Sequence, residues 1–194
     1  ISGGVDSVVL AHLLCSIGQN IALAHVNFQL RGAASDADEA FVQAFAKSLN
    51  VPFYSKAFPT AEIAQSGEGS IQMVARELRY EWFEELRVSQ NAQHIATAHH
   101  LNDSLETAIF NLARGTGIAG LCGIPVRNNH IVRPLLFAEK AEILAYAQTH
   151  QLKWREDASN QTNKYSRNLI RNQVLPLLKQ LNPSLEQTFG QTSQ

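Results

Sequence analysis

Short apolar runs alternate with longer segments of helical period along this chain. Strands are expected at 21–27, 51–55, 94–99 and 131–136, and helices at 5–17, 35–49, 70–88, 102–112, 139–150 and 165–178. Parallel strands need crossover connections of a dozen or more residues, which are usually helices. The alternation therefore predicts an α/β fold with a doubly wound, mainly parallel sheet and a helical extension at the carboxyl-terminal end. Such sheets bind ligands beyond the carboxyl ends of their strands.

The composition is that of a globular domain. The 194 residues are 45% hydrophobic and 17% charged, with a formal net charge of −1, which excludes collagen-like, coiled-coil and disordered classes. Apolar runs are far shorter than the ~20 residues of a membrane-spanning helix, so no membrane association is expected. The two cysteines, Cys15 and Cys122, form no C-x-x-C pair, which favours a reducing, cytoplasmic location.

A pair of glycines directly precedes the first helical segment, within the hexapeptide Ser2–Ser7. Adjacent glycines let the backbone turn tightly and bring its N–H groups against an anion. The helix N-terminus adds further N–H donors and partial positive charge, and Ser2 and Ser7 add hydroxyls. Because the Asp6 carboxylate repels bare phosphate, we expect it to hold a divalent cation. The alternative is an ordinary glycine turn in which Asp6 or Ser7 caps the helix.

The hexapeptide resembles the S-G-G-x-D-S loop of the ATP pyrophosphatase (PP-loop) superfamily, whose members cleave ATP to AMP and pyrophosphate. It differs from the G-x-x-x-x-G-K-[ST] loop of kinases and GTPases because no lysine follows. The resemblance implies a Rossmann-like fold of the adenine nucleotide alpha-hydrolase type, with bound ATP and with Mg²⁺ at Asp6. The ATP-binding residues that it implies in the loop are Ser2, Gly3, Gly4, Val5, Asp6 and Ser7.

Further segments resemble, in the same order along the chain, the tRNA(Ile)-lysidine synthase family. The matching segments are 25–27, 30–32, 75–80, 98–103, 106–107, 114–117, 120–121, 133–136, 157–160, 167–168 and Arg171. Two positions depart from the family pattern. Phe28 stands where many relatives have histidine, and Asn102-Asp103 replaces an acid pair.

The family resemblance implies a two-step reaction on the isoleucine tRNA with a CAU anticodon. ATP adenylates the C2 oxygen of the wobble cytidine and releases pyrophosphate, and the amine of free L-lysine then displaces AMP. The resemblance also implies that His25 and Arg114 belong to the ATP site. Arg114 has an equally simple interpretation, because a cation at a helix C-terminus offsets the helix dipole.

Asp103 and Glu106 are candidates for catalysis and for binding the lysine substrate. They are three residues apart at a helix start, so both carboxylates fall on one face, and His99 lies nearby as a further catalytic candidate. The alternative is helix capping, in which Asn102 or Asp103 is the N-cap and Glu106 belongs to the first turn. Capping and catalysis do not exclude each other.

Basic residues are concentrated near the carboxyl-terminal end. Lys164, Arg167 and Arg171 are the candidates for tRNA binding, and Arg167 and Arg171 lie four apart on one helix face. Phosphate contacts there would give salt-dependent and mostly sequence-independent affinity. A solvated helix face is the alternative for such a run of charges.

We expect one catalytic domain over 1–181, which lacks an upstream strand, and a linker over 182–194 toward further carboxyl-terminal domains. Two rival functions stay open. One is another enzyme of the superfamily, such as a tRNA thiolase or, with fewer matching motifs, an amide-forming synthetase. The other is a nucleotide-dependent RNA-binding module without turnover.

Overall fold

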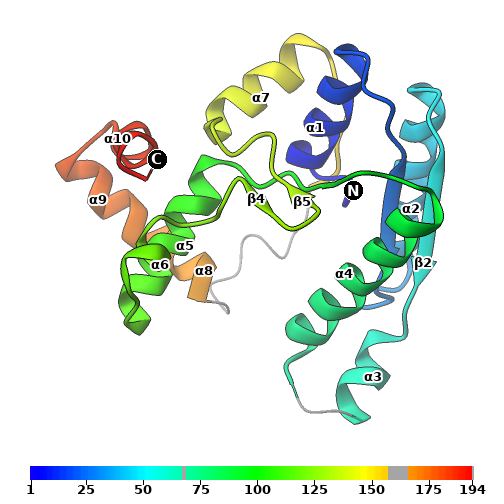
Figure 1. Cartoon of the computed structure of the whole chain (residues 1–194), viewed down its shortest axis with the longest axis horizontal. Coiled ribbons are helices and arrows are strands. Elements are labelled where there is room, and N and C mark those ends of the chain that lie inside the picture. Colours follow the sequence, from blue (N-terminus) through cyan, green and yellow to red (C-terminus); the bar gives the residue numbers. More distant parts are fainter. Residues whose placement is uncertain (67–68, 157–165, 194) are drawn as a thin grey trace. The chain divides into compact units, whose positions relative to one another are not determined.

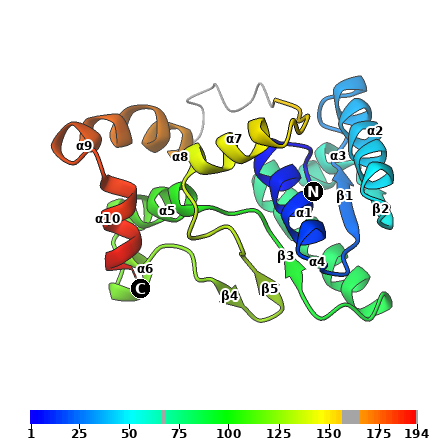
Figure 2. The same ribbon diagram turned by 90° about the horizontal axis from the view of Figure 1, so that it is seen from above.

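The computed structural model describes residues 1–66, 69–156 and 166–193, and these form two compact units (Figures 1 and 2). The first unit contains Ile1–Ile95 and Lys153–Arg155, and the second contains Ala96–Leu152 and Glu156–Gln194. Within the described residues, no helix is long and apolar enough to cross a membrane.

The first unit alternates helices and strands. Its elements are α1 (Val5–Ser16), β1 (Leu23–Asn27), α2 (Ala33–Ser48), β2 (Phe53–Ala57), α3 (Thr60–Ser66) and α4 (Ile71–Ser89). β1 and β2 pair in parallel, with Leu23 beside Phe53 and Asn27 beside Ala57 (Figure 1). Except for α3, each of these elements was predicted from the sequence, with bounds shifted by a few residues.

Helices cover both faces of this strand pair, because successive residues of a strand point to opposite sides. Phe53 packs into the core that α1, β1 and α2 share. Its neighbour Tyr54 points the other way, and its hydroxyl donates to Gln90 Oε1 at 2.6 Å, just after α4. On the same face, Lys56 Nζ lies 3.3 Å from Glu85 Oε2 of α4. The predicted α/β, doubly wound arrangement is confirmed. The buried residues of the shared core are Ala11, Leu23 and Ala46.

Asn27 ties the carboxyl end of β1 to the start of α2. Its Nδ2 donates to Asp36 Oδ1 at 3.1 Å and to Glu39 Oε2 at 3.0 Å, and its Oδ1 accepts from the Gln29 backbone N–H. Hydrogen bonds from Ser55 and Asn27 lower the pKa of Glu39, so the carboxylate stays ionised. The acidic first turns of α2 are thus held at the sheet edge where ligands of this fold class bind.

The second unit is mainly helical. Its elements are β3 (Ile95–Ala96, beginning at the boundary with the first unit), α5 (Leu101–Arg114), α6 (Ile118–Leu121), β4 (Arg127–Asn128), β5 (Ile131–Val132), α7 (Lys140–Thr149), α8 (Ser166–Leu169), the π-helical turn η2 (Ile170–Val174), α9 (Leu175–Leu181) and α10 (Leu185–Thr192). β5 lies between β3 and β4 and pairs with β4 in antiparallel fashion. The strand expected at 131–136 ends at Val132, just before Arg133 and Pro134, and Pro134 cannot donate to a sheet ladder.

Helix α10 corrects the expectation of a linker over 182–194. Leu185 and Phe189, four residues apart, pack from α10 against the core around α5 (Figure 2). Glu186 is 3% exposed and accepts from Asn102 Nδ2 at 2.8 Å, and Lys179 Nζ lies 2.5 Å from its Oε1. The polar composition of this stretch suggested a linker, but Leu185–Thr192 forms a short amphipathic helix, so the linker prediction is wrong for these residues. The domain boundaries themselves stay a prediction.

Asn102 connects α5 to two neighbouring helices. Its Nδ2 donates to Glu186 of α10, and its Oδ1 accepts from the backbone N–H of Lys140, at the start of α7, at 2.9 Å. We therefore expect Asn102 to hold α10 in place. Asn102→Asp places a carboxylate that cannot donate against buried Glu186. We expect a loss of about 1–3 kcal/mol in unfolding free energy at neutral pH and faster amide exchange in α10. Urea unfolding and hydrogen exchange measure both. Gln187→Ala, at an exposed position of α10, is the matched control. Equal behaviour of the two variants would contradict this role.

Candidate functional site

The Ser2–Ser7 loop presents backbone donors at the start of α1. Gly4 is the N-cap of α1, and as a glycine it has no side chain with which to cap the first-turn N–H groups. Ser7 Oγ donates to Gly4 O at 2.9 Å, and Gly4 N–H donates to Ser2 Oγ at 3.3 Å. Helix N-termini of this kind bind anions. The N-cap position is Gly4 rather than Asp6 or Ser7, and phosphate binding by the loop stays a prediction.

Gly3 cannot be replaced without strain, because its φ of +90° lies in a region that side chains rarely adopt. A Cβ there would also lie 3.3 Å from Phe41 Cδ1 and 3.6 Å from Val42 Cγ2 of α2. The loop backbone is thus packed directly against α2.

His25, which was assigned to the ATP site, lies at the base of the loop. The residue is 5% exposed, and Nδ1 is 2.9 Å from Ile1 O. Burial lowers the pKa of His25, so the imidazole is neutral at pH 7. Because a carbonyl oxygen only accepts, Nδ1 carries the proton and donates it. The ring therefore holds the chain that enters the loop.

Arg79 was not among the site residues expected from the sequence, and the structure adds it as a candidate because its side chain lies against Phe28. Its guanidinium lies 5.1 Å from the Phe28 ring centroid. Burial lowers the pKa of Arg79, so the guanidinium lies in a partly desolvated setting. The missed signal is helical spacing, because Arg79 falls on the α4 face of buried Ala75 and Trp82.

In the second unit, α5 begins with a capping box. The His100 backbone N–H donates to Asp103 Oδ2 at 3.1 Å, and the His100 side chain accepts from the Asp103 backbone. The N-cap is therefore His100 rather than Asn102 or Asp103, and Asp103 takes part in capping as the third helical residue of the capping box. The other oxygen of Asp103, Oδ1, accepts from Arg171 Nη2.

Arg171 forms a bidentate ion pair with Glu106. Its Nε lies 2.6 Å from Glu106 Oε1, and its Nη2 lies 2.9 Å from Oε2 and 3.3 Å from Asp103 Oδ1. Glu106 is 1% exposed. The two candidate carboxylates thus form a cation-binding pair, and Arg171, predicted to bind tRNA, is its cation here. No local signal could have revealed a pair 65 residues apart.

The other predicted residues are more dispersed. His99 Nδ1 lies 3.0 Å from Thr97 Oγ1, one residue before the N-cap of α5. Arg114 ends α5 and is exposed, with its guanidinium 5.3 Å from the Phe110 ring. Lys164 lies outside the described residues, and Arg167 lies in α8 with its side chain outside the described part. Their roles, like those of the whole set, stay predictions.

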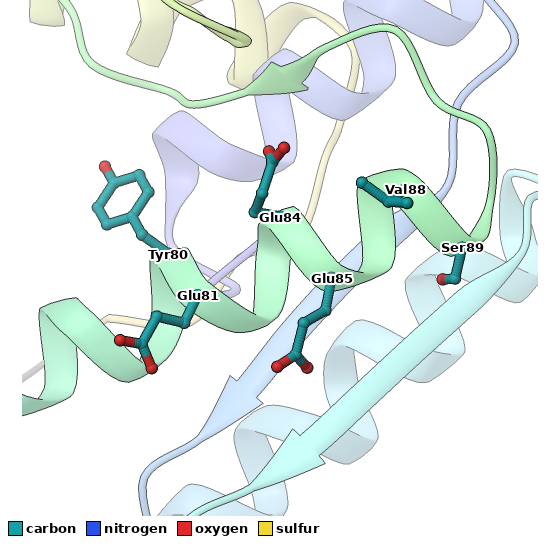
Figure 3. Close-up of a pocket in the computed structure, with 6 residues that line it drawn as sticks. All are labelled: Tyr80, Glu81, Glu84, Glu85, Val88 and Ser89. Carbon is teal, nitrogen blue, oxygen red and sulfur yellow. The ribbon is translucent and has the colours of Figure 1, made fainter.

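A hollow of about 870 Å³ lies along α4 and is a poor site for an anion (Figure 3). Glu81, Glu84 and Glu85 line it, and Glu84 points to one side of α4 while Glu81 and Glu85 point to the other. Glu84 pairs with Arg87 and Glu85 with Lys56. None of the predicted site residues lines this hollow.

Comparison with known proteins gives one family and two kinds of relative. The family model of the PP-loop domain matches residues 1–178. A protein of Porphyromonas gingivalis called tRNA(Ile)-lysidine synthase is 48% identical over 193 residues, which are 99% of this chain and 42% of that protein. A Bacillus subtilis protein with the same name is 39% identical over 201 residues, covering 100% and 43%. The chain spans less than half the length of these curated relatives.

Two solved structures share the fold. The U34-tRNA thiolase NcsA from Methanococcus maripaludis, with its [4Fe-4S] cluster, has a TM-score of 0.79 at 18% identity, over 100% of this chain and 69% of that one. An NH3-dependent NAD synthetase from Campylobacter jejuni has a TM-score of 0.56 at 17% identity, over 97% and 79%. These likenesses concern the fold alone and agree with the predicted α/β class.

Protonation of His25 is expected to destabilise the first unit in mild acid. Because its folded pKa lies below the ordinary value of about 6.5, the unfolded chain binds the proton first. The contribution of neutral His25 to the free energy of unfolding is complete above about pH 6.5, and it is lost as the pH falls toward the pKa of His25 in the folded protein. Urea midpoints measured from about pH 7.5 to 5.5 should fall less steeply in His25→Gln than in wild type. His94→Gln, at an exposed position, is the control and should keep the wild-type slope.

Removal of the Arg171 guanidinium is expected to leave Glu106 buried without its bidentate partner. Arg171→Ala should lower the unfolding free energy by about 1–3 kcal/mol at neutral pH. Arg171→Lys keeps the positive charge but cannot form the bidentate contact, so its unfolding free energy should lie between those of the wild type and Arg171→Ala. Arg127→Ala removes an exposed arginine of β4 as the control. A loss in Arg171→Ala no greater than in this control would contradict the buried-pair interpretation.

Proposed function

Since the chain belongs to the PP-loop domain family, we propose that it is the catalytic domain of a tRNA(Ile)-lysidine synthase. The observation that carries the proposal is the identity of 37–48% to curated proteins of that name along nearly the whole chain. The Ser2–Ser7 loop geometry supports it independently, because the loop offers backbone donors to an anion. The substrates are ATP, L-lysine and the isoleucine tRNA with a CAU anticodon.

In the first step, the C2 oxygen of the wobble cytidine attacks the α-phosphorus of ATP. An O–P bond forms, the bond to the β-phosphate oxygen breaks, and pyrophosphate leaves. Such a transfer depends on positioning and on neutralisation of charge rather than on covalent catalysis. The N–H groups of Gly4, Val5 and the residues after them in α1 bind the phosphates. The proposed role of Ser2 and Ser7 is to add their hydroxyls to this set.

The residues present fit a magnesium ion shared with the phosphates. Asp6 is half-buried in the first turn of α1, beside the loop donors. Among the described residues, no three His, Cys, Asp or Glu side chains gather around one point. This suits Mg²⁺, which is usually held by one or two carboxylates together with phosphate oxygens. When bound, Mg²⁺ supplies charge neutralisation on the phosphates, and Asp6 is the residue proposed to hold it.

In the second step, the lysine amine attacks C2 of the adenylated cytidine. An N–C bond forms, the C–O bond breaks, AMP leaves with that oxygen, and the nitrogen loses a proton. The amine has to be neutral to attack, so a carboxylate must bind it and a base must accept its proton. Asp103 and Glu106 are proposed to bind the lysine, with His99 as a further catalytic group. Their existing pairing with Arg171 supports a preference for cations, and lysine binding there requires Arg171 to release part of its contact.

The tRNA is proposed to contact the basic residues near the carboxyl-terminal end, Lys164, Arg167 and Arg171. Arg171 has an exposed side-chain fraction of 40% beside its ion pair, which leaves part of the guanidinium accessible. Arg114, exposed at the end of α5, and His25 are the further residues assigned to the ATP site.

A thiolase is the less supported rival. Thiolate nucleophiles need a lowered cysteine pKa, whereas burial raises the pKa of Cys15. The chain has two cysteines, fewer than the four thiolates that usually hold an iron–sulfur cluster. The second rival, an RNA-binding module without turnover, predicts tRNA binding with no release of pyrophosphate.

The test is pyrophosphate release from ATP and Mg²⁺ with unmodified tRNA(Ile), with and without L-lysine, followed by mass analysis of the nucleoside. We expect lysine-dependent lysidine from the wild type. Asp6→Ala should slow pyrophosphate release by at least about 100-fold, because it removes electrostatic stabilisation of the transition state. Glu62→Ala, an exposed carboxylate of α3, is the control.

The outcomes separate the candidate functions. Pyrophosphate release without a lysine adduct would support the adenylation step but contradict the assignment of lysine as the nucleophile. Sulfur in the product would establish the thiolase. Unchanged release by Asp6→Ala would remove Asp6 from the mechanism. Binding of tRNA without any release would favour the module without turnover.

A further inference from the structure

We propose that Arg155 is a positioning residue for the Ser2–Ser7 loop, which aims the Gly4 N–H at the phosphates of ATP. The inference rests on the proposed function, because ATP is the ligand of that loop. Neither the loop motif nor the ATP-site assignments from the sequence include Arg155.

The first contact is between two backbones. Arg155 N–H donates to Gly3 O at 3.0 Å. A trans peptide unit is planar, and its C=O and N–H point in opposite directions. The bond to Gly3 O therefore directs the Gly4 N–H away from Arg155. This N–H donates at 3.3 Å to Ser2 Oγ, a side chain on an exposed residue that can rotate away when an anion binds.

An outside contact is needed because the Gly3–Gly4 peptide has little orientation of its own. Two adjacent glycines allow rotation of the peptide plane at small steric cost. Gly3 adopts a φ of +90°, and Gly4 adopts an extended conformation as the N-cap of α1. A rotated plane would present a carbonyl oxygen, instead of an N–H, to the phosphates.

The Arg155 side chain anchors this backbone contact to α2. Its Nε forms an ion pair with Asp38 Oδ1, and Asp38 Oδ2 accepts from Arg31 Nη2 at 2.7 Å. The Asp38 side chain is only 13% exposed, so the charge pairs lie in a partly desolvated setting, where they are stronger than on an open surface.

The same helix holds the other side of the loop. Phe41 and Val42, three and four residues after Asp38, pack against Gly3. Gly3 is therefore fixed from two directions, by the packing of α2 and by the backbone of Arg155. Lys153–Arg155 belongs to the first compact unit although it lies more than fifty residues beyond Ile95 in the sequence.

The consequence is preorganisation. An N–H donor that already points to the position of the bound phosphate needs no reorientation when ATP binds. Less binding free energy is then lost to ordering the loop. The same N–H donor also stabilises the charge that develops on the α-phosphoryl group during transfer. Loss of the Arg155 anchor should therefore weaken ATP binding more than it weakens the fold.

The experiment compares ATP·Mg²⁺ dissociation constants of wild type, Arg155→Ala and Arg155→Lys by calorimetry, with thermal midpoints measured on the same samples. We expect about tenfold weaker binding in Arg155→Ala, equivalent to about 1.4 kcal/mol, and partial recovery in Arg155→Lys. Amide exchange of the peptide that contains Gly4 should be faster in Arg155→Ala. The matched control is Arg87→Ala, which removes an arginine that forms a bidentate ion pair with Glu84 on α4.

Each outcome bears on a defined claim. An ATP affinity of Arg155→Ala equal to that of the wild type would overturn the inference and leave the proposed function intact. An equal loss of affinity in Arg155→Ala and Arg87→Ala would also overturn it, because the effect would then be a general loss of stability. Absence of ATP binding by the wild type would overturn the proposed function and this inference together. A loss confined to Arg155→Ala, with faster exchange at Gly4, supports the inference.

Discussion

The close approach of α2 to the backbone of Gly3 is the constraint on which the first unit depends. A side chain is disfavoured at Gly3, because its φ is +90° and a Cβ would lie 3.3 Å from Phe41 Cδ1. This approach places the loop before α1 against Phe41 and Val42 in the middle of α2. Asn27, at the end of β1, hydrogen-bonds Asp36 and Glu39 nearer the start of that helix. Local backbone geometry, packing and hydrogen bonding thus act on the same few residues, which is why the loop can be both irregular and well defined.

The second unit is organised by charge. Glu106 and Glu186 are almost fully buried on α5 and α10, and each is paired with a cation from the helices between them. Removing water from a carboxylate costs several kcal/mol, so each of these buried carboxylates depends on the cation that pairs with it. Arg171 lies in the π-helical turn Ile170–Val174, and such turns are frequent at functional sites.

Much of the fold and part of the candidate site followed from the sequence. The alternation of α1, β1, α2, β2 and α4 was predicted because hydrophobic period is a local property, and the loop was found because its glycines are adjacent. Helix α10 was missed because its apolar contacts are only Leu185 and Phe189 in a polar stretch. The pairs Arg155–Asp38 and Arg171–Glu106 join residues 117 and 65 positions apart, and periodicity cannot show such partners.

The two departures from the family pattern have structural explanations in this chain. Phe28 carries the Arg79 guanidinium on its ring face, an interaction that histidine provides less well when protonated. Asn102 donates to buried Glu186, which a carboxylate at that position could not do. Asn102 and Glu186 are therefore coupled in this chain, because a carboxylate at position 102 would lose the hydrogen bond to Glu186 and place a second negative charge beside it. The amide at position 102 thus serves the packing of α10 against α5.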